Sequence, residues 1–371
     1  MKIFYDGIIY GHYSSRPGGI SNFFDHLISN VSCYYNCLLT SSRPSHLPHP
    51  KGPKLYIQRN NFKISPGRIN NKLEKLCFTM RADLFRPHVI HSTYYGNPTI
   101  VFSRAPIIYT VYDMILEKWA SDLDPSGVLI KEKRKSLERA AALPCISNAT
   151  RNDLIDLYPH LKSKTSVIYL AGQPKYEAKK NQHFNHGLAL DPYILYVGAR
   201  SSYKNFKRFV SVFSRVSIQF SKLRLKVAGS PWSTDERIHI QSLGIENKID
   251  IYSSIEDVDL YELYSHSTAF VYPSLYEGFG IPPLEAMSLG TPVLASNTSS
   301  IPEITGDAAL LFNPWSESEI YNAIIKILTD RALREELIKK GKRRCLQFSW
   351  EKTSAEYIEL YHNVVRKSKW K

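Results

Sequence analysis

The chain has 371 residues, of which 43% are hydrophobic and 12% aromatic, so its composition fits a folded protein with two ordinary cores rather than a disordered one. Its net charge of +14 is concentrated in residues 1–180, which carry 25 Lys and Arg against 13 Asp and Glu, a net of +12, whereas residues 181–371 carry +2. The five cysteines have neither disulfide nor zinc spacing. No apolar run approaches the roughly 18 residues that cross a bilayer, and no signal segment precedes the first strand. We therefore expect a cytoplasmic protein.

The first half of the chain alternates short apolar runs with amphipathic stretches. Such alternation is typical of strands and helices in a parallel α/β architecture. The runs that we expect to form strands are Lys2–Asp6, Cys37–Thr40, Lys54–Ile57, His88–His91, Ile107–Tyr112, Pro144–Ser147 and Ser166–Leu170. The polar stretch Ala171–His186 then interrupts the alternation, and we interpret it as belonging to a linker between two domains.

The second half restarts the same alternation. Its expected strands are Tyr193–Val197, Leu223–Ala228, Ile249–Ser253, Ala269–Tyr272, Pro292–Ala295 and Leu310–Phe312. Helices are expected over residues 205–220 and from the capping-box pattern Ser316-x-x-Glu319 to about residue 328. The predicted organisation is an N-terminal domain over residues 1–175, a linker over 176–190 and a C-terminal domain over 191–349. Two such domains leave a cleft, where ligands of parallel sheets usually bind.

The segment Tyr272–Val293 carries the most chemical information. A strand is expected to end near Tyr272, and a glycine-bearing loop with Gly278 and Gly280 follows it. Two prolines then preset the backbone for a short helix. Backbone N–H groups at the positive end of that helix would be exposed to a ligand, because glycines allow close approach. The pattern therefore predicts a binding site for a diphosphate.

Two acids, Glu277 and Glu285, flank this helix start, one in the loop and the other in the first helical turn. A carboxylate accepts two hydrogen bonds side by side, which suits vicinal hydroxyls such as a ribose diol or two sugar hydroxyls. Taken singly, Glu277 could be a solvated loop acid, and Glu285 could be favoured by the helix dipole alone. The two together favour the functional interpretation.

This segment resembles the acidic signature of family 4 retaining glycosyltransferases, in which seven residues separate two glutamates. The resemblance covers nearly the whole chain, and its blocks occur in the order that the family has. They are Gly18-Gly19-Ile20 after the first strand, the basic loop from Val197 to Asn205, Ser300–Ala308, and Phe312-Asn-Pro314. It implies a GT-B fold, with two Rossmann-like domains facing across a cleft and the sugar donor held in the C-terminal half. Many members assemble bacterial envelope polysaccharides or glycolipids.

The resemblance also implies how the donor is held. Arg200 and Lys204 would bind its diphosphate, and cations fixed there would stabilise the negative charge that the leaving group gains. Ordinary loop cations are the alternative. The other residues expected to bind the donor are Gly18, Gly19, Glu277, Gly278, Phe279, Gly280, Ile281 and Glu285. No Asp-x-Asp pair lies near these loops, so we expect no metal and no cofactor beyond the nucleotide sugar.

The family usually has a His-Asp pair at the end of an N-terminal strand, where this sequence has Tyr112-Asp113. Tyr112 therefore replaces the histidine, and a phenol can still hydrogen-bond a sugar hydroxyl. His91 and His12 are neighbouring candidates, although a lone histidine at a strand end is more often structural. We expect Glu277, Tyr112, Asp113 and His91 to carry the catalytic roles. In similar proteins a final helix such as Trp350–Lys371 crosses back onto the N-terminal domain, but the sequence does not distinguish this from a plain C-domain helix.

The sugar and the acceptor are less constrained by the sequence. The preferred donor is UDP-glucose, with GDP-mannose as the alternative, and the acceptor is expected to be a glycan or a lipid-diphosphate-linked sugar. The basic N-terminal half has two interpretations. It could make peripheral contact with anionic lipid at the inner membrane face, or it could simply be a mildly basic, solvated surface. A nucleic-acid-binding protein is the rival of another class, but no nucleic-acid motif is present. The candidate membrane contacts are Lys72, Lys75, Arg81 and Arg86, beside Leu73, Leu76, Phe78 and Met80.

Overall fold

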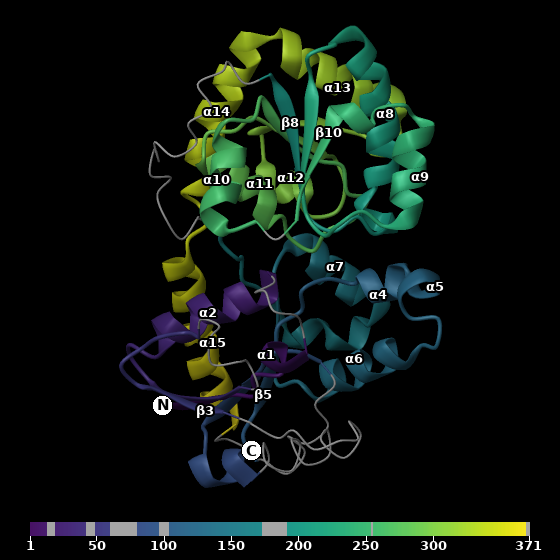
Figure 1. Ribbon diagram of the computed structural model, residues 1–371. Helices are drawn as coiled ribbons and strands as arrows, with labels where there is room; N and C mark the ends of the chain where they lie inside the picture. The colour runs from purple at the N-terminus through teal and green to yellow at the C-terminus, as the bar shows by residue number, and fades with distance from the viewer. Residues whose placement is uncertain are drawn as a thin grey trace. The chain divides into compact units, whose positions relative to one another are not determined.

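The computed structural model describes residues 1–12, 19–41, 49–59, 80–95, 104–172, 191–253 and 255–368. The chain divides into two units, one made of Met1–Leu170 with Trp350–Lys371 and the other of Ala171–Ser349. Each unit is built on its own parallel sheet with flanking helices (Figure 1). The protein is therefore an α/β protein with two parallel-sheet domains. Within the described ranges, no helix has both the length and the apolar character needed to cross a bilayer.

The sheet of the first unit has the strand order β3-β2-β1-β4-β5. Its strands are β1 (Lys2–Tyr5), β2 (Asn36–Ser41), β3 (Leu55–Arg59), β4 (Val89–Ser92) and β5 (Ile107–Tyr109), all paired in parallel. Two single bridges, Ile108 to Ala142 and Val111 to Cys145, continue the pairing toward β6 (Leu143–Cys145), which pairs with β7 (Thr165–Val167). The expected strand at Ser166–Leu170 thus lies partly beyond β7.

Helices of the first unit follow the amphipathic stretches between these strands. Among the described residues they include α1 (Ile9–His12), α2 (Gly19–Val31), α4 (Ile115–Lys118), α5 (Ala120–Leu123), α6 (Val128–Arg139), α7 (Asn148–Leu157) and the 3-10 helix η2 (Pro159–Lys164). The C-terminal helix α15 (Trp350–Ser368) belongs to the same unit. In α2 most of the apolar residues recur at helical spacing and are fully buried, among them Phe23, Phe24 and Leu27.

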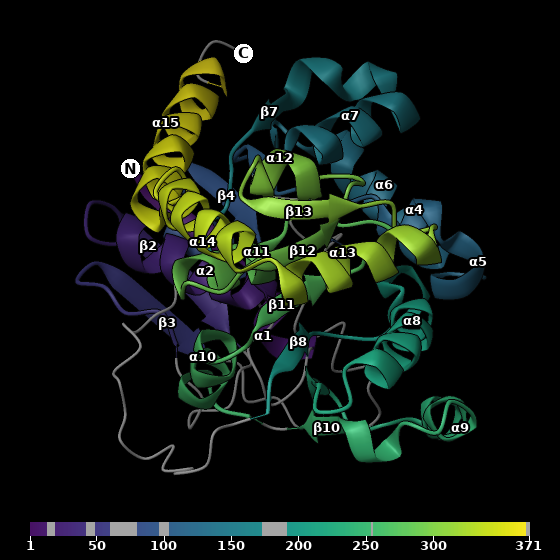
Figure 2. The ribbon, with the colours of Figure 1, turned by 90° about the horizontal axis from the view of Figure 1, so that it is seen from above.

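Helix α15 packs on α2 of the first unit, although the chain reaches it only after completing the second (Figures 1 and 2). The ring of Trp350 stacks on His26 at 4.5 Å, and that of Tyr357 lies 5.5 Å from Phe23. The hydroxyl of Thr353 donates to the carbonyl of Tyr169 at 2.7 Å. Because these aromatic faces are buried against the first unit, its core includes residues from both ends of the chain.

The sheet of the second unit has the order β10-β9-β8-β11-β12-β13. Its strands are β8 (Tyr193–Val197), β9 (Arg224–Ala228), β10 (Ile249–Tyr252), β11 (Ala269–Tyr272), β12 (Val293–Ser296) and β13 (Ala309–Phe312). Its helices are η3 (Ser202–Lys204), α8 (Phe206–Gln219), α9 (Thr234–Ser242), η4 (Glu246–Lys248), α10 (Asp257–Ser265), α11 (Ile281–Ser288), α12 (Ile301–Thr305), α13 (Glu317–Thr329) and α14 (Arg331–Cys345). Helices α8 and α9 lie on one side of β8 and β10, and α10 lies on the other (Figure 1).

The helix expected after Ser316 is confirmed as α13, with a different cap from the one predicted. The Ser316 hydroxyl accepts from the Glu319 backbone N at 3.2 Å, but the Glu319 carboxylate accepts from the backbone N of Asn313. A complete capping box occurs instead at α9, between Ser233 and Glu236.

The strand order of the second unit reverses between β8 and β11, which are neighbours in the sheet. In such sheets ligands bind beyond the carboxyl ends of the strands at this reversal. The basic loop follows β8 and the acidic loop follows β11, so the fold brings the two predicted donor motifs to one edge of the sheet.

Candidate functional site

Asn205 holds together three loops at the carboxyl edge of the second sheet. It adopts a left-handed backbone conformation, with φ of 56°, between η3 and α8. Its amide Nδ2 donates to the carbonyl of Pro273 at 3.1 Å and to that of Pro314 at 2.8 Å. The backbone N of Leu275 also donates to the carbonyl of Tyr203 at 2.7 Å. The loops after β8, β11 and β13 are therefore fixed to one another by hydrogen bonds to backbone groups.

Lys204 and Glu277 form an ion pair at this edge, with Nζ of Lys204 2.7 Å from Oε1 of Glu277. Their side chains are 17% and 9% exposed, so the pair is mostly shielded from water. The backbone N of Glu277 donates to the hydroxyl of Ser299 at 2.9 Å, and the hydroxyl of Ser300 donates to the Glu277 carbonyl at 2.9 Å. Burial and the adjacent Glu277 carboxylate, a hydrogen-bond partner, raise the pKa of the Tyr272 phenol well above its usual value.

Helix α11 begins after Gly280, whose φ of 138° is unfavourable for any residue with a side chain. The helix starts at Ile281, so Glu285 is its fifth residue and lies just beyond the first turn, in which it was expected. The hydroxyl of Tyr264 donates to Oε2 of Glu285 at 3.3 Å. Burial raises the pKa of Glu285 to about 7, the hydrogen bond from Tyr264 opposes that rise, and the charge of Asp257 adds to it.

The side chain of Phe279 contributes to packing at this site. It is 4% exposed, and its ring meets that of Phe348 edge to face at 5.9 Å. Its backbone carbonyl accepts from the hydroxyl of Ser300 at 2.5 Å. Ile281 is partly buried at the helix start, and Gly278 is buried. The Phe279 ring is therefore part of the packing that supports this loop.

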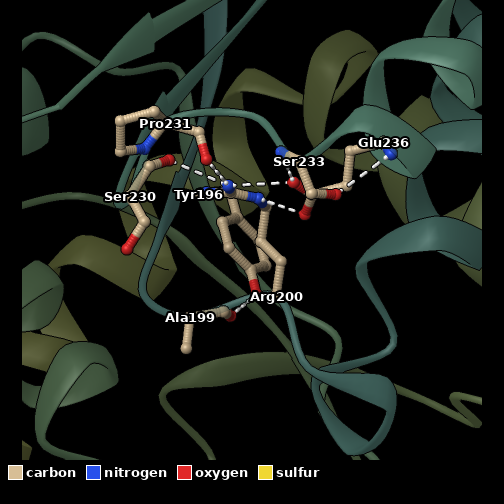
Figure 3. Close-up of polar contacts among 7 residues, drawn as sticks. All are labelled: Tyr196, Ala199, Arg200, Ser230, Pro231, Ser233 and Glu236. Carbon is tan, nitrogen blue, oxygen red and sulfur yellow. Dashed lines mark hydrogen bonds and ion pairs between the residues drawn. The ribbon is translucent and has the colours of Figure 1, made fainter.

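Arg200 does not pair with the acids of the Glu277 loop (Figure 3). Its Nε lies 2.6 Å from Oε1 of Glu236, and its Nη2 lies 3.1 Å from Oε2 of the same carboxylate. Nη2 also donates to the carbonyls of Ser230 and Pro231 at 2.8 and 3.0 Å. The guanidinium carbon lies 4.7 Å from the ring centroid of Trp232. The two cations of the basic loop thus have different partners in the second unit.

In the first unit, His91 is fully buried under α15. Its Nδ1 is 2.7 Å from the hydroxyl of Tyr361, and its Nε2 is 2.9 Å from Oγ1 of Thr110. Burial lowers the pKa of His91 to about 3. These contacts favour a structural role for His91, which links the sheet to α15, whereas a catalytic role needs a group that substrate can reach.

The Tyr112-Asp113 pair lies in the segment between β5 and α4. Tyr112 is 6% exposed, and its hydroxyl donates to the carbonyl of Thr93 at 3.4 Å. Oδ1 of Asp113 accepts from the backbone N of Ile115 at 3.0 Å, at the start of α4. Gly19 is exposed at the first position of α2, while Gly18 and the side chain of His12 lie outside the described residues. The catalytic assignments made for Tyr112 and Asp113 stay predictions.

Several contacts of this site involve residues that sequence analysis did not single out as contributors. Ser299 and Asn205 hold the loops through backbone groups, and Tyr264 supports Glu285 from α10. Glu236 was also missed, although Ser233-x-x-Glu236 has the spacing of a capping box. Only that spacing was available as a signal, because the other contacts join residues far apart in sequence.

Two family models match the chain in succession. Residues 37–171 match the model described as "Glycosyltransferase Family 4", and residues 178–344 match "Glycosyl transferases group 1". Together with the two parallel-sheet domains, these matches establish that the chain belongs to the family 4 glycosyltransferases and has their GT-B fold.

The chain is also similar in sequence to individual proteins and in fold to solved structures. O-antigen chain mannosyltransferase B of Escherichia coli is 31% identical over 240 residues, which cover 62% of this chain and 63% of that protein. The serotype-specific mannosyltransferase WbdA of Escherichia coli is 29% identical over 248 residues, 64% of this chain and 30% of that protein. The match thus spans less than two thirds of either relative. Among solved structures, sucrose-phosphate synthase from Thermosynechococcus elongatus has a TM-score of 0.79 at 19% identity, with 99% of both chains covered, and shares the fold.

Proposed function

We propose that this protein is a retaining glycosyltransferase that transfers mannose from GDP-mannose to a glycan or lipid-linked acceptor in envelope polysaccharide assembly. The ion pair between Lys204 and Glu277 carries the proposal, because it joins the basic and acidic motifs at the strand reversal. Mannose replaces the glucose preferred from sequence, since both relatives named above are mannosyltransferases. Membership of the family gives no support to the nucleic-acid alternative.

In the proposed reaction the diphosphate of the donor lies against Lys204 and the amino end of α11. As the bond to the sugar breaks, negative charge grows on the leaving phosphate, and Lys204 stabilises it more strongly than in the bound donor. Glu277 then orients the sugar, and Glu285 accepts hydrogen bonds from the ribose hydroxyls. The leaving phosphate helps to take the acceptor proton, and the acceptor attacks from the same face.

We also propose that the basic N-terminal half contacts anionic lipid at the inner membrane face, where a lipid-linked acceptor would be met. Of the residues named for this contact, Met80 is 56% exposed, Arg81 is partly exposed and Arg86 is exposed. The neighbouring Leu84 is 82% exposed, which adds an apolar side chain to the same segment. Lys72, Leu73, Lys75, Leu76 and Phe78 lie outside the described residues.

A thermal-shift panel tests the donor assignment. GDP-mannose, UDP-glucose, an ADP-sugar and a dTDP-sugar are each added to the protein. A donor at 100 times its dissociation constant should stabilise the fold by ~2.7 kcal/mol, which gives a clear rise in Tm. We expect GDP-mannose to give the largest rise, followed by transfer of radiolabelled mannose to an envelope-glycan acceptor. A rise with another sugar nucleotide alone would correct the donor, and no rise with any would refute the proposed activity.

A further inference from the structure

The guanidinium of Arg200 is buried in the second unit, and most of its nitrogen atoms donate hydrogen bonds there. Its side chain is 5% exposed. Nε and Nη2 donate to the Glu236 carboxylate, and Nη2 also reaches two backbone carbonyls (Figure 3). Nη1 is buried and finds no hydrogen-bond partner among the residues that the structure describes. A buried donor left unpaired costs about 1–3 kcal/mol, so a bound acceptor at Nη1 would recover free energy.

Backbone from two strand ends lies close to Nη1. Gly229 follows β9, and a Cβ placed on it would lie 2.9 Å from Nη1 and 2.7 Å from the carbonyl oxygen of Gly198, which follows β8. A side chain at Gly229 would therefore displace Arg200 or the β8 loop. Nη1 thus lies at the carboxyl edge of the sheet, in the same loop region that supplies Lys204.

Glu236 is held from two directions, which fixes the position of its carboxylate. It is the third residue of α9, and its backbone N donates to the hydroxyl of Ser233 at 3.2 Å. Its Oε2 accepts from the backbone N of Ser233 at 2.7 Å. The ring of Trp232 covers the guanidinium on one face, and Phe206 lies 5.7 Å from the guanidinium carbon. The rotamer of Arg200 is consequently set by the start of α9.

We infer that Glu236 is a positioning residue, which holds Arg200 so that its Nη1 faces the diphosphate of the bound donor. This inference rests on the proposed function, because the ligand at Nη1 is the donor of that reaction. The bidentate contact with Glu236 uses one edge of the guanidinium and leaves the Nη1 hydrogens for a phosphate oxygen. Without the carboxylate, the long side chain would lose this orientation and the entropy of ordering it would oppose donor binding.

The test compares Glu236→Gln with a matched control, Glu319→Gln. Both are the third residue of a helix whose N-cap is a serine, but Glu319 accepts from the Asn313 backbone where Glu236 holds an arginine. The amide of Gln can still accept from the Ser233 backbone N, so the cap and the fold should persist. Calorimetric titration with GDP, or with the diphosphate of whichever donor wild type binds, gives the affinities. We expect a roughly tenfold loss for Glu236→Gln and no change for Glu319→Gln.

A double-mutant cycle separates positioning from a purely structural effect. Arg200→Met keeps the apolar stem beside Trp232 and removes every donor. In that background Glu236→Gln should cause no further loss of affinity. Three results would overturn the inference and leave the proposed function standing. Glu236→Gln could bind the nucleotide as tightly as wild type, or more tightly. Alternatively, the losses of affinity from the two substitutions could simply add in the cycle. Wild type that binds no nucleoside diphosphate would instead refute the proposed function, and the inference with it.

Discussion

Nζ of Lys204 lies 2.7 Å from Oε1 of Glu277, and this ion pair joins loops that follow two different strands. A bound diphosphate would bring negative charge to a lysine that is already balanced by a carboxylate. Lys204 could then share its three donors between the two anions. The pair holds the lysine in place, and in the proposed reaction this is the position where leaving-group charge would develop.

Replacing Lys204 tests this arrangement. Lys204→Ala removes the cation and leaves the Glu277 carboxylate, 9% exposed, without its lysine. We expect kcat/KM to fall by roughly 100-fold, as when one preorganised donor is lost from a transition-state site. Lys207→Ala is the control, because Lys207 is an exposed lysine of the adjacent helix α8 and should leave kcat/KM unchanged. Unchanged turnover and nucleotide affinity in Lys204→Ala would remove the lysine from the donor site.

Glu285 predicts a pH dependence of donor binding. Burial raises its pKa to about 7, so the carboxyl is largely protonated at pH 6 and ionised at pH 8. Only the ionised form accepts hydrogen bonds on both oxygens from a ribose diol. Nucleotide affinity should therefore rise as the pH increases from 6 to 8, and Glu285→Gln should abolish that rise. Calorimetry at four pH values, with Glu303→Gln as the control, would show it.

The same raised pKa has the opposite effect on stability. Between pH 4.5 and 7 the folded protein keeps a proton on Glu285 that the unfolded chain has released, so the contribution of Glu285 to stability decreases as the pH rises. Glu285→Gln should thus be more stable than wild type at pH 8, with little difference at pH 4.5. A wild-type affinity that is flat across pH 6 to 8 would contradict the assignment of Glu285 to the ribose.

The parts of the structure that sequence could predict are those that periodicity and local motifs encode. Short apolar runs identified the core strands of both sheets, and Gly280 and Pro282 marked the start of α11. Because both donor motifs follow strands, their meeting at one sheet edge also followed from the parallel order. Glu285 was expected in the first helical turn but lies just beyond it, since the helix begins at Ile281.

The partners of individual side chains were not predictable in the same way. Arg200 and Lys204 lie in one short loop, yet one pairs with Glu236 and the other with Glu277. Loop conformation decides those directions, and residue spacing does not encode it. His91 shows the same limit, because its partner Tyr361 is 270 residues away on a helix whose placement the sequence left open.

Stereochemistry is the third prediction. Family membership and the proposed front-face attack predict that an α-linked donor gives an α-linked product. Proton NMR of the new glycosidic bond distinguishes the anomers directly, through the one-bond C–H coupling when the sugar is mannose. A β-linked product from an α-linked donor would show that the transfer inverts, and the roles given to Glu277 and the leaving phosphate would then be wrong.

Metal independence is the fourth prediction. Arg200, Lys204 and the amino end of α11 are expected to balance the diphosphate in place of a divalent ion. Asp257 and Asp259 have Asp-x-Asp spacing but are exposed in the first turn of α10, away from the basic and acidic loops in sequence. Transfer should therefore continue at full rate in excess EDTA. Activity that vanishes with EDTA and returns with Mg²⁺ or Mn²⁺ would contradict the prediction. If Asp257→Asn shows the same metal dependence as wild type, the metal does not bind at the Asp257 pair and would instead bind the donor.

Membrane contact is the fifth prediction, and it follows from the uneven charge of the chain. Residues 1–180 carry net +12, against +2 for residues 181–371, and a donor diphosphate needs only a few cations. Each basic residue near an anionic surface contributes about 1 kcal/mol, screened over about 10 Å in 0.1 M salt. Co-sedimentation with liposomes should require anionic lipid and weaken as salt rises. It should also drop when four cations are changed to Ser, namely Lys72, Lys75, Arg81 and Arg86.

A control variant changes four exposed lysines of the second unit to Ser, namely Lys207, Lys222, Lys326 and Lys339. It removes the same charge from the whole chain, so it separates a local basic surface from net charge. We expect this variant to bind anionic liposomes as wild type does. An equal loss of liposome binding in both variants would show that net charge alone explains the binding. If wild type does not bind anionic liposomes at low salt, the basic charge of residues 1–180 would instead point to a soluble acidic acceptor.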